Sequence, residues 1–253
     1  MRNTIAPGRC DPFLLNIILF SPAEVELPLP RRDPRAGHIL EVLRRRAGGT
    51  FDAGLIDGPR GQGTLVEAGL TSLKLAFAWG APPPPLSPLA LLVGLPRPQT
   101  ARDILREATA LGVAAIHFVR TERGEAAYAA SSLWRTGAWR EQVVAGAAQA
   151  FCTRLPAVTH GLTLAEATAA LPAQAARIAL DNYESTVALG EAVATGSPAA
   201  ALALGAERGW SDAERNWLRD HGFVLAHLGR RVLRTETACI AAITLLKARL
   251  GWL

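Results

Sequence analysis

The sequence predicts a mixed α/β protein of two domains, a small β-barrel over residues 16–80 and an α/β domain with a parallel sheet over residues 89–253. Three observations support this prediction. Residues 81–88, APPPPLSP, contain four consecutive prolines, which cannot continue a helix or a central strand and favour a stiff linker. Short segments punctuated by glycine and proline precede this linker, as in small barrels. Apolar runs alternate with helical patterns after it, as in parallel α/β domains.

The barrel is expected to contain four strands and one short helix. The strands are expected at residues 16–20, 50–56, 63–68 and 73–79, with a turn at Asp57-Gly58-Pro59. The helix is expected at residues 36–46, where Ile39, Val42 and Leu43 form an i, i+3, i+4 apolar stripe. Residues 1–15 are interpreted as a loose extension before the first strand.

The second domain is expected to begin with residues 89–95, a continuous apolar run typical of a buried parallel strand. Thr100, followed by Asp103, is the expected N-cap of the next helix, and Gly112 its end. Further strands are expected at residues 113–119, 177–180, 200–204 and 223–228. Further helices are expected at residues 139–150 and 235–250. Another helix is expected to begin at a capping box formed by Ser211 and Glu214.

Composition narrows the class of protein. A net charge of +5 and a pI of about 9.7 fit a polyanionic partner without requiring one. The three cysteines match neither a disulfide framework nor the spacing of a metal site, which indicates a reducing cytoplasm and no bound metal. No apolar run reaches the ~18 residues of a membrane span, and residues 13–20 lack the features of a signal peptide. We therefore expect a cytoplasmic protein without a membrane partner.

Two blocks near the C-terminus carry the strongest functional signal. Each is expected to form the end of a strand, a tight glycine turn and the start of a helix: LGAERGW at residues 204–210 and LGRRVLRTETA at residues 228–238. Gly205 and Gly209 permit positive φ angles and close backbone approach. Two such turns side by side would present backbone polar groups and a helix N-terminus to a small polar ligand. For the first block alone, an ordinary βα turn is the favoured interpretation.

The second block resembles the cofactor-binding end of the 16S rRNA (uracil-N3) methyltransferase family, the RsmE type. That family belongs to the trefoil-knotted (SPOUT) RNA methyltransferases, which use S-adenosylmethionine. The first block resembles the family's GPEGG turn but carries Ala206 in place of proline and Arg208 in place of a glycine, and Arg230 replaces a proline in the second block.

The resemblance implies a PUA-like β-barrel that binds RNA, followed by a knotted SPOUT domain, in a cytoplasmic homodimer. It implies methyl transfer from S-adenosylmethionine to N3 of a uridine in 16S rRNA, with the small ribosomal subunit as partner. The cofactor-binding residues that it implies are Leu204, Gly205, Glu207, Gly209, Leu228, Gly229, Val232, Leu233 and Thr235. Thr235 is also the expected N-cap of the last helix.

The proposed reaction sets chemical requirements. The N3 proton must leave, and the negative charge spreads to O2 and O4, where a fixed cation would lower the barrier. Arg234 is the first candidate for this cation and Arg231 the second. Glu236 is a candidate general base, although solvent could also accept the proton. Alternatively, Arg234 and Glu236 form a capping and ion-pair arrangement that only supports the fold.

Arginine-rich segments suggest where RNA binds. The candidate RNA-binding residues are Arg31, Arg32, His38, Arg44 and Arg46 in the barrel, in a cluster that also includes Arg35, and Arg123 and Arg154 in the second domain. They would contact phosphates rather than read the base sequence. A charged, solvated helix face is the alternative for the barrel cluster. Asp181 and Glu184, which follow a strand, are interpreted as part of a solvated turn, with a functional pair of carboxylates as the less favoured alternative.

Two other functions are compatible with the same fold: a knotted methyltransferase that acts on a different RNA or base atom, and an RNA-binding member without catalysis. A nicotinamide-dependent oxidoreductase is disfavoured, because residues 94–98 read GLPRP and no G-x-G-x-x-G follows the first strand of the α/β domain.

Overall fold

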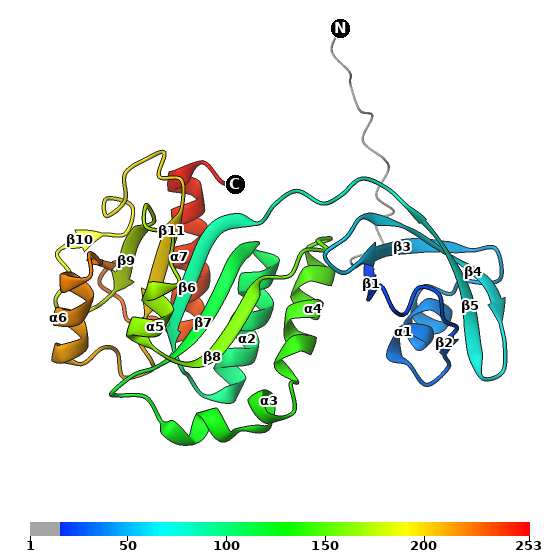
Figure 1. Ribbon diagram of the computed structural model, residues 1–253, viewed down its shortest axis with the longest axis horizontal. Helices are drawn as coiled ribbons and strands as arrows, with labels where there is room; N and C mark the ends of the chain where they lie inside the picture. Colours follow the sequence, from blue (N-terminus) through cyan, green and yellow to red (C-terminus); the bar gives the residue numbers. More distant parts are fainter. Residues whose placement is uncertain (1–15) are drawn as a thin grey trace, which may run out of the picture. The chain divides into compact units, whose positions relative to one another are not determined.

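The computed structural model describes residues 16–253 (Figure 1). The interpretation of residues 1–15 as a loose extension, and Cys10 with it, lies outside the described residues. The chain forms two compact units. The first runs to Pro83 and includes Ala148–Thr153, and the second comprises Pro84–Ala147 and Arg154–Leu253. The boundary between them falls inside the run of prolines.

The first unit is built on a curled five-stranded sheet with the order β1-β3-β4-β5-β2. Its strands are β1 Ile18–Phe20, β2 Leu29–Pro30, β3 Thr50–Leu55, β4 Arg60–Ala68 and β5 Ser72–Trp79. Strands β1 and β3 pair in parallel, whereas the other pairs are antiparallel. Phe20, Ile39, Leu65 and Leu73 form the centre of its core.

The helix that the sequence predicts at residues 36–46 is shorter than expected. Helix α1, Pro34–Gly37, begins after an Asp33 cap and continues into one π-helical turn, His38–Val42. Arg44 then adopts a φ of 52°, which ends the helical path. Ile39 is buried but Val42 is 65% exposed, so the predicted apolar stripe is wrong at Val42.

Arg35 belongs to an ion-pair cluster in the first unit. Its guanidinium contacts Glu24 at 2.5 Å and Asp33 at 2.8 Å, and donates to the Leu19 carbonyl at 3.0 Å. The hydrogen bond from Arg35 lowers the pKa of Glu24 to about 2, even though burial opposes ionisation. These partners give Arg35 a structural function, so it is not available to bind phosphate.

The second unit contains a seven-stranded, all-parallel sheet with the order β10-β12-β9-β11-β6-β7-β8. The strands are β6 Ser87–Gly94, β7 Val113–Arg120, β8 Ala157–Thr163, β9 Ala176–Leu180, β10 Val187–Ala188, β11 Ala200–Leu204 and β12 Val224–His227. Strand β11 is buried along its whole length. The order of the strands in the sheet differs from their order in the sequence around β9. Strand β11 lies between β6 and β9, while β12 lies on the other side of β9.

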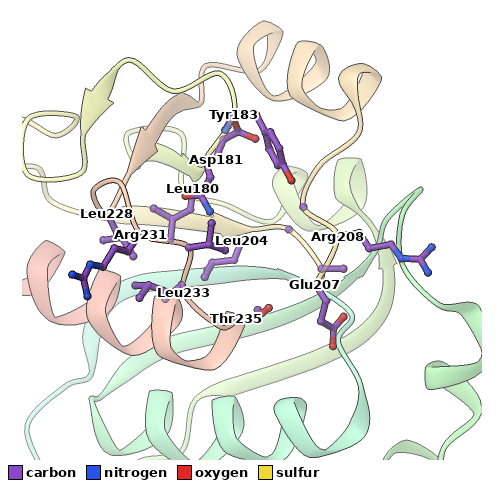
Figure 2. Close-up of a pocket in the computed structure, with 16 residues that line it drawn as sticks. Leu180, Asp181, Tyr183, Leu204, Glu207, Arg208, Leu228, Arg231, Leu233 and Thr235 are labelled. Atoms are coloured by element: carbon purple, nitrogen blue, oxygen red, sulfur yellow. The ribbon is translucent and has the colours of Figure 1, made fainter.

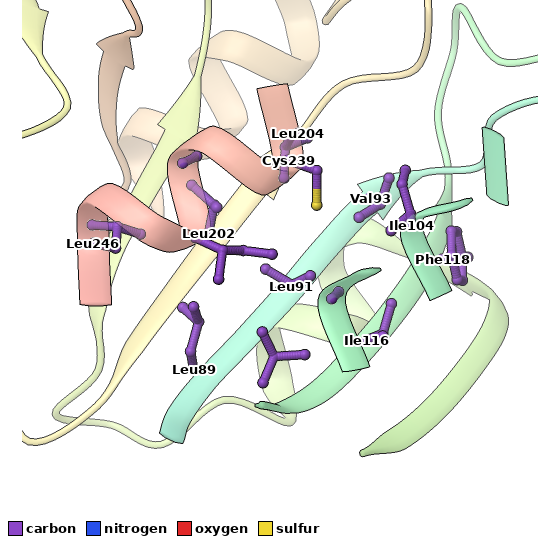
Figure 3. Packing of buried hydrophobic residues seen from close by; sticks show 14 of the residues in the cluster. Leu89, Leu91, Val93, Ile104, Ile116, Phe118, Leu202, Leu204, Cys239 and Leu246 are labelled. Atoms are coloured by element: carbon purple, nitrogen blue, oxygen red, sulfur yellow. The ribbon is translucent and has the colours of Figure 1, made fainter. Parts of the chain in front are cut away.

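Helices cover both faces of this sheet (Figure 1). They are α2 Pro98–Ala110, η2 Ala126–Ala130, α3 Ser132–Arg135, α4 Trp139–Gln149, α5 Leu164–Ala169, α6 Asp212–Asp220 and α7 Thr235–Leu250. The larger core joins Leu91 and Leu202 of the sheet to Ile104 of α2 and to Cys239 and Leu246 of α7 (Figure 3). The smaller core, on the other face, surrounds Trp210 and Leu218. Within residues 16–253, no helix is long and apolar enough to cross a membrane.

Two helix starts, strand β8 and helix α5 are among the details of the second unit that differ from the sequence-based predictions. The N-cap of α2 is Arg97, not Thr100, because Pro98 occupies the first turn, where its fixed φ suits a helix start. The N-cap of α7 is Arg234, so Thr235 is already helical and does not cap it. Strand β8 and helix α5 were not expected, since β8 is a partly exposed edge strand interrupted by Gly161 and has no continuous apolar pattern.

The capping box at the start of α6 is confirmed. The Ser211 hydroxyl accepts from the backbone N–H of Glu214 at 3.1 Å, and the Glu214 carboxylate accepts from the backbone N–H of Ser211 at 2.8 Å. Gly222, with a φ of 80°, lies two residues after the end of the helix. Helix α6 therefore begins at a fixed position directly after the first glycine turn.

Candidate functional site

Three loops enclose a cavity of about 220 Å³ at the carboxyl edge of the parallel sheet (Figure 2). They follow β9, β11 and β12, and we call them loop A (residues 181–185), loop B (residues 205–211) and loop C (residues 228–234). Ligands of parallel α/β proteins typically bind at this edge, where strand order reverses. The two blocks singled out in the sequence are loops B and C, so the fold brings them together. Loop A was not predicted to take part.

Most of the residues expected to bind a cofactor line this cavity. They are Leu204, Gly205, Glu207, Gly209, Leu228, Val232, Leu233 and Thr235. Gly229 does not line it; with a φ of 104°, Gly229 instead turns the chain out of β12. Arg231 also lines the cavity.

Loop B is a tight turn in which the two glycines have different functions. Gly209 adopts a φ of 67°, which favours glycine. Gly205 is needed for close packing, because a Cβ there would lie 2.8 Å from the carbonyl carbon of Gly209 and 3.0 Å from the backbone nitrogen of Trp210. The buried Trp210 donates its indole N–H to the Leu180 carbonyl at 2.9 Å. This hydrogen bond ties loop B to the end of β9.

The family's prolines and glycine are replaced in loops B and C without closing the cavity. Ala206 is buried, and its backbone nitrogen lies so near Gly94 that a Cβ on Gly94 would approach it to 2.4 Å. The Arg208 side chain points away from the cavity leucines (Figure 2), and its carbonyl accepts a hydrogen bond of 3.3 Å from Arg123. Arg123 is thereby held at the rim of loop B.

Loop C exposes apolar side chains next to an open helix end. Val232 is 81% exposed and Leu233 is 36% exposed, although both line the cavity. The side chain of Arg234, the N-cap residue of α7, makes no capping hydrogen bond. Apolar side chains that remain exposed beside a cavity are suited to contact an apolar or aromatic part of a ligand.

Loop A is held by a buried ion pair, which corrects the interpretation of Asp181 as part of a solvated turn. The Asp181 carboxylate is buried and accepts from Arg215 Nε at 2.8 Å and from the backbone N–H groups of Tyr183 and Glu184 at 2.9 and 2.6 Å. Burial would raise the pKa of Asp181, but the hydrogen bonds from Glu184, Arg215 and Tyr183 outweigh it and lower the pKa.

A second, larger cavity of about 460 Å³ adjoins the first. The two share Glu207, Leu233 and Thr235 as walls, and Arg234 and Glu236 line only the second. The two arginine candidates are therefore separated, with Arg231 in the first cavity and Arg234 in the second. Among the described residues no ion pair within 4 Å joins Arg234 to Glu236. The alternative that these two side chains form an ion pair is therefore not supported.

Glu207 is fixed between the two cavities. Its carboxylate accepts from the backbone N–H of Arg97 at 2.9 Å and lies 3.6 Å from Arg97 Nε. Arg97, which is the N-cap of α2, and Asp103 of α2 are part of the polar wall of the second cavity. Neither residue was predicted to belong to the site, since Arg97 lies 110 residues before Glu207 in the chain.

The remaining candidates for RNA contacts are on the surface of each unit. In the first unit Arg31, Arg32, Arg44 and Arg46 are exposed, while His38 is half-buried. In the second unit Arg154 is half-buried and donates to the Pro84 carbonyl at 3.1 Å. Within the described residues no group of three or more His, Cys, Asp or Glu could hold a metal ion.

Comparisons with known proteins agree with this arrangement. A family model described as an RNA methyltransferase domain matches residues 82–247. A ribosomal RNA small subunit methyltransferase E from Treponema pallidum is 35% identical, over 92% of this chain and 91% of that protein. A ribosomal RNA small subunit methyltransferase E 1 from Borreliella burgdorferi is 25% identical, over 93% of this chain and 99% of that protein.

A solved structure shares the fold. It is the crystal structure of a ribosomal RNA small subunit methyltransferase E from Neisseria gonorrhoeae bound to S-adenosyl methionine, with a TM-score of 0.74, 23% identity and coverage of 92% of this chain and 98% of that one. Together with the family model and the Treponema relative, this likeness extends over nearly the whole chain. The chain therefore belongs to the RNA methyltransferase family and, within it, to the RsmE type that residues 228–238 resemble.

Proposed function

We propose that this protein transfers a methyl group from S-adenosylmethionine to N3 of a uridine in the 16S rRNA of the small ribosomal subunit. The relatives from Treponema and Borreliella are named for methylation of small-subunit ribosomal RNA. The observation that carries the proposal is the junction of loops B and C around one cavity, with Arg234 in an adjoining polar cavity. A ribosomal substrate also supports a cytoplasmic location.

The residues of the first cavity fit the donor. Leu204, Leu228 and Leu233 offer apolar walls for an adenine ring, and the backbone of loop B approaches too closely to Gly205 for any larger residue. S-adenosylmethionine supplies a methyl group on a sulfonium, which is already a strong electrophile. The loops contribute orientation, which converts an encounter of two molecules into a step within one complex.

The second cavity is proposed to hold the acceptor uracil. In the reaction the N3–CH₃ bond forms, the methyl–sulfur bond breaks, and the N3 proton leaves. Arg234 would stabilise the negative charge that develops on O2 and O4. Glu236, in the same cavity, is the proposed acceptor of the proton. Arg231, which lines the first cavity, is proposed to contact the donor rather than the base.

Both units are proposed to have the folds that the resemblance to the RsmE type implies. The curled sheet of the first unit is proposed to be a PUA-like barrel, and Arg31, Arg32, His38, Arg44 and Arg46 to contact RNA phosphates together with Arg123 and Arg154 of the second unit. The second unit is proposed to carry the trefoil knot of SPOUT enzymes. The sheet has the order β12-β9-β11, so the chain passes from β11 across β9 to β12 before it reaches α7. This strand order supports the proposed topology.

A homodimer is proposed for the assembly. Helix α7 is apolar on more than its buried face: Leu245 is 49% exposed, and Ile240 and Ala241 are half-buried. A helix that is apolar on both faces usually packs against a second partner. A second copy of this chain is the proposed partner on this face.

Gly205→Ala tests the fit of the donor. The added Cβ would meet the backbone of Gly209 and Trp210 at 2.8 to 3.0 Å, so loop B must open. We expect calorimetry to show at least ~10-fold weaker binding of S-adenosylmethionine, which corresponds to about 1.4 kcal/mol. Gly190→Ala is the matched control, because a Cβ at Gly190 meets nothing within 4 Å. Equal affinity in the two variants would contradict the proposed cavity.

The function itself is tested by methyl transfer in solution. Small ribosomal subunits from cells that lack the gene, incubated with the protein and labelled S-adenosylmethionine, should gain label in N3-methyluridine, as measured by mass spectrometry of nucleosides. Label at another base atom, or only in another RNA, would favour a different substrate. Binding of RNA without any transfer would favour a non-catalytic member of the family.

A further inference from the structure

Tyr183 is an aromatic side chain held in place although it is exposed. It lines the first cavity from loop A and is 75% exposed. Figure 2 shows it beside Asp181, on the side of the cavity that faces the Arg208 loop. A Cβ on Gly209 would lie 3.7 Å from the edge of its ring, so loop B packs next to it. Exposed aromatic rings at a cavity rim are typical of ligand contacts.

The ring is supported by the buried Arg215. The guanidinium carbon of Arg215 lies 5.1 Å from the centroid of the Tyr183 ring, within the range of a cation–π contact. The backbone N–H of Tyr183 donates to the Asp181 carboxylate at 2.9 Å. Side chain and backbone of Tyr183 are thus both tied to one buried ion pair.

Arg215 cannot itself serve as an anchor for phosphate. Its side chain is only 4% exposed and contacts the carboxylates of Asp181 and Asp212 at 2.8 Å and of Glu184 at 3.6 Å. Its charge is therefore neutralised within the protein. What this arrangement presents to the cavity is a flat and uncharged aromatic ring.

We propose that Tyr183 stacks on a nucleobase in the site and that the Asp181–Arg215 pair positions it for this contact. The inference rests on the proposed function, in which two nucleobases enter the site, the adenine of the donor and a base of the RNA. Stacking on an aromatic side chain tolerates either base, because each has a π-face. Tyr183 is a binding residue in this proposal, whereas Asp181 and Arg215 are positioning residues.

Tyr183→Ala tests the stacking contact. We expect binding to weaken about 10-fold, within the range of base–aromatic stacking, while kcat stays within about twofold of wild type. Calorimetry with S-adenosylhomocysteine reports on adenine, and the KM for RNA at saturating donor reports on the RNA base. A change in the first assigns the stacked ring to the donor, and a change in the second alone assigns it to the RNA. Tyr183→Phe should retain wild-type binding in both.

Leu253→Ala is the control, since it removes another exposed apolar side chain of the same unit, 77% exposed and outside both cavities. Unchanged binding in both assays for Tyr183→Ala would overturn the inference, as would a loss of kcat that Tyr183→Phe shares. The proposed function fails separately, when the wild-type protein itself transfers no methyl group.

The double variant Asp181→Asn/Arg215→Met tests the positioning. It removes both buried charges together, and asparagine keeps an oxygen that can accept from the backbone of loop A. We expect a folded protein with the weakened binding of Tyr183→Ala, and little further loss when Tyr183→Ala is added, because the three residues act as one unit. Fully additive losses would contradict positioning by the pair.

Discussion

Arg234→Ala is expected to reduce kcat by ~100-fold or more while S-adenosylmethionine still binds with wild-type affinity. Removing a group that stabilises negative charge in a transition state has effects of about 10²–10³ in kcat. Arg234 lines the second cavity but not the first, so its removal should not change the affinity for S-adenosylmethionine. Single-turnover methylation of small subunits, together with donor calorimetry, measures the two effects separately.

Two neighbouring arginines of loop C serve as controls. Arg230 lines neither cavity, so Arg230→Ala should leave kcat near wild type. Arg231 lines the first cavity, so Arg231→Ala should weaken donor binding more than it lowers kcat. Near-normal turnover in Arg234→Ala would remove Arg234 from the mechanism, and equal losses in all three variants would indicate a general effect of charge on RNA binding.

Arg215→Ala is expected to destabilise the second unit by about 3–5 kcal/mol, because it leaves the buried carboxylate of Asp181 without its cation. The side chains of Arg215 and Asp181 are 4% and 1% exposed, so water cannot replace the lost partner. Denaturant unfolding followed by tryptophan fluorescence measures the loss. Trp210, whose indole N–H donates to the Leu180 carbonyl at the end of β9, is one of the six tryptophans that contribute to this signal.

Arg219→Ala is the matched control on the same helix. Arg219 also pairs with a carboxylate, Glu184, but both side chains are 41% exposed. Exposed pairs contribute ~0–1 kcal/mol, so this variant should unfold close to wild type. An equal loss of unfolding free energy in the two variants would show that the buried ion pair contributes no more to stability than the exposed one.

Acid should act on the same ion pair. The folded-state pKa of Asp181 is lowered, so the stability that its charge contributes is present above the unfolded-state pKa and is lost as the pH falls through the folded value. The difference in stability between wild type and Arg215→Ala should therefore shrink in strongly acidic solution.

The sequence predicted those features that depend on neighbouring residues. The Ser211–Glu214 capping box, the positive φ of Gly209 and the turn at Gly229 each follow from residue types a few positions apart. The same local reasoning failed at Thr100 and Thr235, because Pro98 begins α2 two residues before Thr100 and Arg234 is the N-cap of α7 one residue before Thr235. Capping residues compete over a few positions, and helix boundaries are accordingly hard to predict.

Features that join distant segments could not be predicted from pattern. Asp181 and Arg215 are 34 residues apart, and nothing in the residues around Asp181 indicates a buried partner. Arg97 reaches Glu207 across 110 residues, so the second cavity has no continuous signature. The resemblance of residues 228–238 predicted loop C, but loop A joins the cavity only because β9 pairs with both β11 and β12, which no local pattern in the sequence indicates.

Amide hydrogen exchange with and without S-adenosylmethionine tests the central claim most directly, namely that loops B and C together hold the donor. We expect added donor to slow exchange at residues 205–209 and 228–235, with a smaller effect at residues 181–185, and to leave the strands of the first unit unchanged. Protection that is absent from loops B and C, or confined to the first unit, would contradict the claim.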